Sequence, residues 1–149
     1  MTNKIINIKN LDDSIKFSKD LASKLKPNDK VLLYGDLGVG KTVVAKEICN
    51  YFKVNKNITS PTFTLLKSYD VDSKSIKHIY HFDLYRIKSI EELFDIGFEE
   101  YLYIDNSILI IEWPEIAENF FSDNVIKIYI EKSNNEFERL IRIENDQKH

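Results

Sequence analysis

The chain has 149 residues, of which 43% are hydrophobic and 30% are charged, a mixture typical of one globular domain. No apolar run approaches the roughly 20 residues of a membrane span, and the first residues lack the apolar block of a secretory signal. The single cysteine, Cys49, cannot form an internal disulfide, and the net charge of −3 opposes strong autonomous binding of nucleic acid. We therefore expect one cytoplasmic domain over residues 1–149, with a loose polar tail after about residue 144 and no role at a membrane.

The first third of the chain predicts a strand, a helix and a second strand. Residues 5–8 alternate weakly in polarity, as a strand does. Asn10 is a suitable N-cap for a helix over about residues 11–25, whose apolar side chains recur along one face. The apolar run 31–34 is typical of a buried strand, and a glycine-rich segment separates it from a helix over about residues 41–52. This succession of strand, glycine loop and helix is the setting that a phosphate-binding loop requires.

The rest of the chain departs from a regular alternation of strands and helices. Residues 64–69 and 76–82 are predicted to form an antiparallel hairpin around a polar turn. The remaining predicted elements are a helix over 89–102 interrupted at Gly97, a central strand over 107–111, a short helix from Pro114, and closing strands over 125–130 and 137–143. We therefore expect an α/β fold of the P-loop NTPase type: a mixed sheet with a parallel core, an antiparallel hairpin and closing strands, flanked by helices.

The glycine-rich segment matches G-x-x-x-x-G-K-[ST] in full. It consists of Gly35, Asp36, Leu37, Gly38, Val39, Gly40, Lys41 and Thr42. Glycines let consecutive backbone N–H groups surround a phosphate, and the following helix directs the positive end of its dipole at the same anion. Lys41 is expected to reach the outer phosphates of ATP, and the Thr42 hydroxyl to ligate Mg²⁺. The alternative is a glycine-rich turn that binds nothing, but three of the chain's four glycines fall within this segment.

Two carboxylates directly follow or end predicted strands. Glu112 comes after the apolar strand 107–111, so it emerges at the carboxyl edge of the sheet, where ligands bind in open α/β folds. Asp83 follows the strand 76–82 and is a second candidate. A P-loop site needs an acid at such a position to hold or orient the metal ion. We therefore expect Glu112 and Asp83 to serve metal binding and hydrolysis, although a surface glutamate after a core strand is an alternative for Glu112.

Three further features lie near these carboxylates in the sequence. His78 and His81 are three residues apart on a strand and face opposite sides, which disfavours a shared metal, whereas His81 and Asp83 share a face and are expected to form a hydrogen-bonded pair. Trp113 either covers the nucleotide or fills the core. The segment 59–63 carries hydroxyls that either meet the metal or the γ-phosphate, or simply lie in a turn fixed by a proline.

Four motifs taken together are more specific than the phosphate loop alone. They occupy residues 35–42, 60–63, 81–86 and 111–115. Their order and spacing closely resemble the TsaE (YjeE) family of small bacterial ATPases over about residues 5–143. The resemblance implies a slow, Mg-dependent auxiliary ATPase that acts with TsaB and TsaD in the threonylcarbamoyladenosine modification of tRNAs reading codons that begin with A. It implies that tRNA is engaged only indirectly, through these partners.

Site roles are also carried over by this resemblance. The implied roles are phosphate and metal binding for Lys41 and Thr42, metal positioning and hydrolysis for Glu112 and Asp83, and lining of the nucleotide site for Trp113 and Thr62. One departure concerns Val43, which stands where a second hydroxyl residue is frequent, so a hydroxyl contact to the inner phosphate is lost. We expect this loss to affect affinity rather than function.

Two rival functions remain at this stage. A small-molecule P-loop kinase usually carries an arginine-bearing lid, but the chain has only Arg86, Arg139 and Arg142 and no lid-sized insertion. A GTPase switch would carry an Asn-Lys-x-Asp guanine reader, and residues 55–58 lack the final aspartate. The sequence therefore favours an ATPase.

Overall fold

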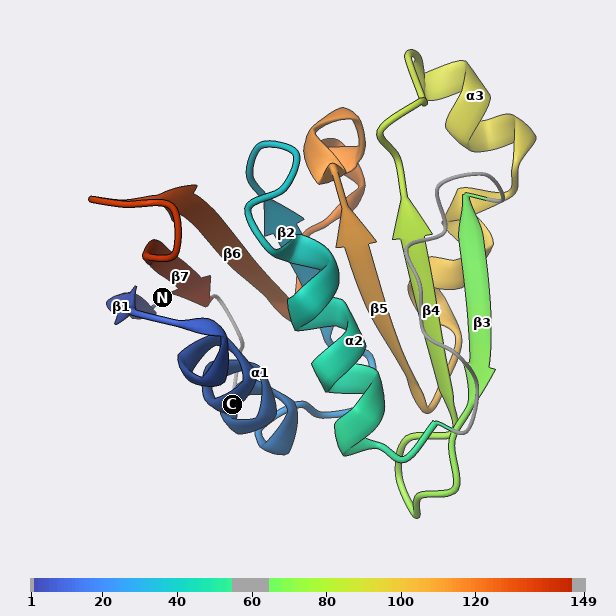
Figure 1. Ribbon diagram of the computed structural model, residues 1–149. Coiled ribbons are helices and arrows are strands. Elements are labelled where there is room, and N and C mark those ends of the chain that lie inside the picture. The colour runs from blue at the N-terminus through green and yellow to red at the C-terminus, as the bar shows by residue number, and fades with distance from the viewer. Residues whose placement is uncertain (1, 55–64, 146–149) are drawn as a thin grey trace.

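The computed structural model describes residues 2–54 and 65–145. Its seven-stranded sheet has the order β1-β7-β6-β2-β5-β4-β3 (Figure 1). In chain order the elements are β1 (Thr2–Ile8), α1 (Leu11–Ser23), β2 (Lys30–Tyr34), α2 (Lys41–Tyr51), β3 (Leu66–Asp70), β4 (His78–Asp83), α3 (Ile90–Asp95), the 3₁₀ helix η1 (Phe98–Tyr103), β5 (Ser107–Glu112), the 3₁₀ helix η2 (Pro114–Phe120), β6 (Val125–Lys132) and β7 (Arg139–Asn145). The part of the predicted tail after residue 145 lies outside the described residues.

The centre of the sheet is parallel and both margins are antiparallel. Strand β2 pairs in parallel with β5 and with β6, and β4 pairs in parallel with β5. The hairpin β3–β4 forms one margin, and β7 runs antiparallel to both β6 and β1 at the other. This arrangement confirms the predicted α/β fold with a parallel core, an antiparallel hairpin and closing strands.

Helices α1 and α2 cover one face of the sheet (Figure 1). Helix α1 begins at the predicted cap, where the Asn10 side chain accepts a hydrogen bond from the backbone N–H of Asp13 at 2.9 Å. Apolar side chains of both helices, among them Phe17 and Ile48, pack on those of the strands beneath. Cys49 is fully buried in this core, and burial raises the pKa of its thiol to about 12, which fits a packing role.

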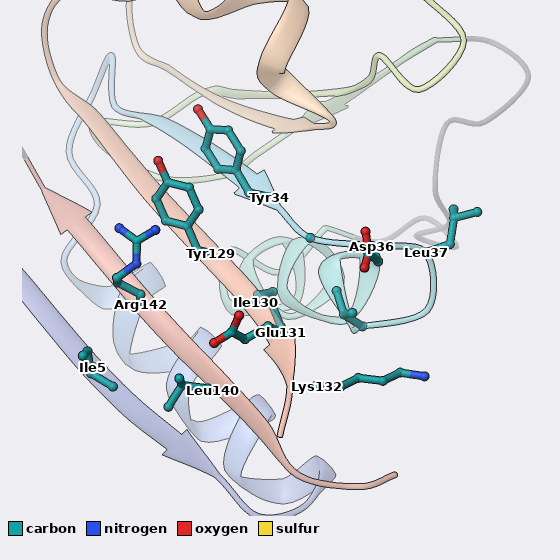
Figure 2. Close-up of a pocket in the computed structure, with 12 residues that line it drawn as sticks. Ile5, Tyr34, Asp36, Leu37, Tyr129, Ile130, Glu131, Lys132, Leu140 and Arg142 are labelled. Carbon is teal, nitrogen blue, oxygen red and sulfur yellow. The ribbon is translucent and has the colours of Figure 1, made fainter. Parts of the chain in front are cut away.

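The second face of the sheet is covered over only part of its width. There α3, η1 and η2 enclose a second core over β2, β5 and β4, which includes Leu32, Phe82, Phe98 and Ile111. Beside β6 and β7 the same face borders an open cavity instead (Figure 2). No helix of the described chain is long and apolar enough to cross a membrane.

One predicted boundary is confirmed and another differs. The predicted helix 89–102 divides at Gly97, as expected, because this glycine adopts a left-handed conformation (φ 72°) between α3 and η1. Phe137, predicted to lie in the last strand, instead precedes β7. The Asn135 side chain accepts hydrogen bonds from the backbone N–H groups of Phe137 and Glu138. These bonds form a turn, so β7 begins only at Arg139.

Candidate functional site

The glycine loop connects the fully buried strand β2 to the N-terminus of α2 at the carboxyl edge of the sheet. Gly35 has φ 145°, and a Cβ atom there would lie 2.5 Å from the carbonyl oxygen of Ile130 in β6. Gly40 adopts φ 113° and caps α2 without a side-chain hydrogen bond. The backbone N–H groups of the first turn of α2 are therefore presented at the sheet edge, as an anion site requires.

Lys41 projects into this edge and is held away from water. Its residue is 5% exposed, its Nζ donates a hydrogen bond to the carbonyl oxygen of Gly35, and the same atom lies 3.5 Å from the centroid of the Trp113 ring. Burial lowers the pKa of Lys41 below its ordinary value, although Glu112 and other carboxylates nearby oppose the shift. Among residues 2–54 and 65–145, no carboxylate is close enough to form an ion pair with it. A bound phosphate would supply that counter-charge.

Glu112 of β5 lies next to residues of three other elements, β2, α2 and β4. It ends β5, is buried, and lies beside Leu33 of β2 in the parallel register. Its Oε1 accepts a hydrogen bond from the Thr42 hydroxyl at 3.1 Å, and its Oε2 lies 2.7 Å from Nε2 of the buried His81. Because a carboxylate oxygen can only accept, Nε2 of His81 carries the proton. The carboxylate is thus oriented from both sides.

The predicted hydrogen bond between His81 and Asp83 is wrong. His81 bonds to Glu112 across the strands, and its Nδ1 is buried without a partner among the described residues. Ile110 is the residue opposite His81 and Asp83 is opposite Glu112, so Glu112 lies diagonally across from His81 on the neighbouring strand. Long side chains at such diagonal positions are still within reach of each other. His78 is on the other side of the strand, where it contacts Asp70 and stacks on Tyr80.

Asp83 lies at the same edge as Glu112, as the sequence predicted. The two residues are register partners at the ends of β4 and β5, and Asp83 is buried. Its Oδ1 accepts a hydrogen bond from the backbone N–H of Tyr85 at 3.0 Å, which fixes the chain as it leaves β4. The parallel pairing of β4 and β5 therefore brings together two carboxylates that are 29 residues apart in the sequence.

Trp113 lies over the site rather than inside the core. The residue is partly exposed with a left-handed backbone (φ 56°), and its ring contacts Lys41 on one side and the Tyr85 ring, 4.8 Å between centroids, on another. The structure therefore does not support the alternative in which Trp113 fills the core, and its cover of a nucleotide stays a prediction. The predicted contact of Thr62 with the nucleotide, and the whole segment 59–63, lie outside the described residues.

Arg139 is a loop-supporting residue that the sequence analysis did not identify. Its Nε donates a hydrogen bond to the carbonyl oxygen of Val39 at 2.9 Å, and its Nη1 donates to the carbonyl oxygens of Glu136 and Glu138. The guanidinium thus ties the start of β7 to the glycine loop. No sequence pattern pointed to this contact, because the two residues are 100 positions apart.

Two cavities flank the glycine loop. The larger, of about 680 Å³, lies on the face of β6 and β7 that α1 does not cover, and Figure 2 shows Tyr34, Tyr129 and Arg142 along it. The two tyrosine rings stack at 4.4 Å, and the guanidinium lies 3.9 Å from the Tyr129 ring. The smaller cavity, of about 300 Å³, lies between the start of α1, the first turn of α2 and the β6–β7 turn, and its lining includes Leu11, Gly38, Val43, Phe137 and Arg139.

Comparison with known proteins gives a consistent set of relatives. The family model described as "Threonylcarbamoyl adenosine biosynthesis protein TsaE" matches residues 8–141. A protein of Rickettsia felis named tRNA threonylcarbamoyladenosine biosynthesis protein TsaE is 45% identical over 83% of this chain and 70% of its own length. The protein of that name from Bacillus subtilis is 30% identical over 83% of this chain and 75% of its own length. A crystal structure titled Bacillus subtilus YdiB superimposes with a TM-score of 0.76 at 25% identity, covering 95% of this chain and 84% of that one.

Proposed function

The chain belongs to the TsaE family of tRNA threonylcarbamoyladenosine biosynthesis proteins, and from this premise we propose that it is the Mg-dependent auxiliary ATPase of that pathway. In this proposal it acts in the cytoplasm with TsaB and TsaD homologues, on tRNAs that read codons beginning with A. The observation that carries the enzymatic part is the joining of the glycine loop to a buried, oriented carboxylate through Thr42 and Glu112.

The oxygen atoms at this junction suit Mg²⁺. A hydroxyl and a carboxylate are the hard oxygen ligands that Mg²⁺ prefers. The oxygens of Thr42 and Glu112 lie 3.1 Å apart. In our proposal these two groups hold the ion, which when bound would neutralise charge on the outer phosphates.

In this proposal three side chains have the remaining roles in binding and hydrolysis. Lys41 has a desolvated ammonium and would bind the outer phosphates. His81 keeps Glu112 in one orientation through Oε2, which leaves Oε1 directed at Thr42. In our proposal Asp83, on the neighbouring strand end, would help Glu112 to orient the attacking water. Charges held in fixed positions away from water stabilise developing charge most effectively.

The smaller of the two cavities is the better place for the base of ATP. Its lining includes Val43, the position at which the inner phosphate is expected, together with the apolar side chains of Leu11 and Phe137. The larger cavity is lined by Gly35 and Asp36 but by no residue of α2. Because the base is attached through the inner phosphate, we propose that it occupies the cavity beside Val43. Apolar and aromatic lining is typical of nucleotide-base pockets.

We propose slow turnover by the isolated chain, in which Lys41 and Arg86 are the candidate cations of the site and the other two arginines are engaged elsewhere. Arg139 is engaged by the glycine loop, and Arg142 pairs with Glu144 and covers Tyr129. An arginine at the transferred phosphoryl group can raise the rate of hydrolysis by about 10³-fold or more. We propose that a partner completes the site, and that the chain with its net charge of −3 binds tRNA poorly by itself.

The test is the ATPase rate of the purified chain with and without the TsaB and TsaD homologues of the same organism, alongside tRNA binding at physiological salt. We expect slow hydrolysis that needs Mg²⁺, a rise in rate on addition of both partners, and weak tRNA binding by the chain alone. A rate that does not respond to the partners, or tight tRNA binding by the lone chain, would contradict the proposal.

A further inference from the structure

The segment that leaves β4 and forms α3 keeps large apolar side chains in water. Phe94 is 53% exposed, and Ile90, one helical turn before it, is exposed as well. The residues of this region that pack in the core are Leu93 and Phe98, which are fully buried. Tyr85 is 49% exposed on the same connection from β4. A group of exposed apolar side chains in one short segment marks a contact surface more often than isolated ones do.

The chain from α3 onward, over residues 89–126, is strongly acidic. Residues 89–126 contain ten carboxylates and no lysine, arginine or histidine, although the whole chain carries 21 lysines and arginines. Glu91, Asp95 and Glu99 are exposed around Phe94 in the sequence. None of these three takes part in an ion pair within residues 2–54 and 65–145. Ile90 and Phe94 therefore lie among these carboxylates, whereas Tyr85 is followed by the exposed cations Arg86 and Lys88.

The segment is directly connected to the proposed nucleotide site. Helix α3 lies toward the same edge of the sheet as the glycine loop (Figure 1). The ring of Tyr85 contacts that of Trp113 at 4.8 Å, and the Trp113 ring lies 3.5 Å from Nζ of Lys41. Two contacts, from Tyr85 to Trp113 and from Trp113 to Lys41, therefore link this segment to the residue that would bind the outer phosphates.

We propose that Tyr85, Ile90, Glu91, Phe94, Asp95 and Glu99, together the α3 surface, form the docking site for the TsaB–TsaD pair. The inference rests on the proposed function, which supplies the partner, and adds where that partner binds. Charge complementarity requires the partner to present apolar side chains surrounded by lysine or arginine. A nucleic acid or an anionic membrane would be repelled, and a second copy of this chain would bring two acidic surfaces together.

The apolar and the charged components are tested separately, each with a matched control. Phe94→Ser removes an exposed aromatic ring, and its control is Ile5→Ser in β1, where the native side chain is 64% exposed. The double variant Glu91→Lys/Glu99→Lys reverses two charges on the α3 surface. Its control, Asp20→Lys/Glu131→Lys, makes the same change in net charge at exposed positions of α1 and β6. Thermal melts and ATP titrations verify that each variant is folded and retains its nucleotide site.

Binding to the purified TsaB–TsaD pair is measured by calorimetry at low and at physiological salt, with ATP present. We expect Phe94→Ser and Glu91→Lys/Glu99→Lys each to weaken binding about tenfold or more, as loss of a hot-spot residue does, with both controls unchanged. The charge-reversed variant should also lose most of the salt dependence.

The outcomes separate this inference from the proposed function. If the unaltered chain binds the pair and both α3-surface variants bind equally well, the docking site is wrong and the proposed function stands. If the unaltered chain does not bind the pair at all, both are overturned. If Phe94→Ser abolishes binding of tRNA rather than of the protein pair, the surface belongs to RNA and the inference is overturned.

Discussion

The two sides of the glycine loop hold their functional groups in opposite ways. On the β5 side, Lys41, Glu112 and His81 are buried, and each contacts another residue of the site. On the side of β6 and β7, Phe137 is 74% exposed, Leu11 is also exposed, and open cavities border the loop. Charged groups that act on a reacting phosphate gain from exclusion of water, whereas a surface that admits a ligand must stay accessible.

The difference suggests a division between chemistry and recognition. If it holds, substitutions on the β5 side change phosphate binding and turnover by large factors, and substitutions on the β6–β7 side change affinity moderately without altering the chemical step. The following predictions test that division.

The largest effect is expected for Lys41→Ala. We expect ATP affinity to fall about 10- to 150-fold, because a charged hydrogen-bonding partner of the phosphates is worth about 1.5–3 kcal/mol. Stability should change little, since the substitution also removes a desolvated ammonium. ATP titration together with a thermal melt measures both quantities. Unchanged ATP affinity in a folded variant would remove Lys41 from the phosphate site.

Glu112→Gln should separate hydrolysis from binding. The amide keeps the shape of the side chain but loses the charge that positions metal and water, so we expect the rate of hydrolysis to fall about 100-fold while ATP affinity changes by less than about threefold. Single-turnover hydrolysis and ATP titration provide the two measurements, and Glu131→Gln on β6 is the control. Hydrolysis at the unaltered rate would assign the role to Asp83 or another group.

His81→Leu should produce a smaller loss of the same kind. Without the donor at Oε2, Glu112 is free to turn, and we expect the rate of hydrolysis to fall about tenfold with ATP affinity nearly unchanged. A buried carboxylate oxygen without its donor also costs about 1–3 kcal/mol of stability. His81→Gln retains a donor and should recover most of the rate. Equal rates for the leucine and glutamine variants at matched stability would show that His81 does not position Glu112.

Phe137→Ala tests the recognition side. Loss of an aromatic contact to a base is worth about 1–3 kcal/mol, so we expect ATP and ADP to bind about tenfold more weakly, with the rate at saturating ATP unchanged. Phe94→Ala, another exposed phenylalanine outside the proposed base pocket, should leave nucleotide affinity unaltered. If Phe137→Ala binds ATP normally, the base does not occupy the cavity beside Val43.

The fold was largely predictable because most of its elements are encoded locally. Asn10 caps α1 as expected, Gly97 divides α3 from η1, and the apolar runs became the buried strands β2 and β5. Each of these features depends on a few neighbouring residues and on backbone conformation, which the sequence states directly. The phosphate loop is similar, because its glycines, lysine and threonine are contiguous.

Other contacts could not be predicted from the sequence, because they join residues that only strand pairing brings together. His81 was predicted to pair with Asp83 within its own strand, but the pairing of β4 with β5 placed Glu112 diagonally across from His81, and these two side chains meet. The bond from Arg139 to Val39 likewise depends on how β7 returns beside the loop. The sequence determined the order of the elements and which residues are the candidates for the chemistry. The tertiary structure alone decided which side chains meet, because distances across a sheet are set by register rather than by separation along the chain.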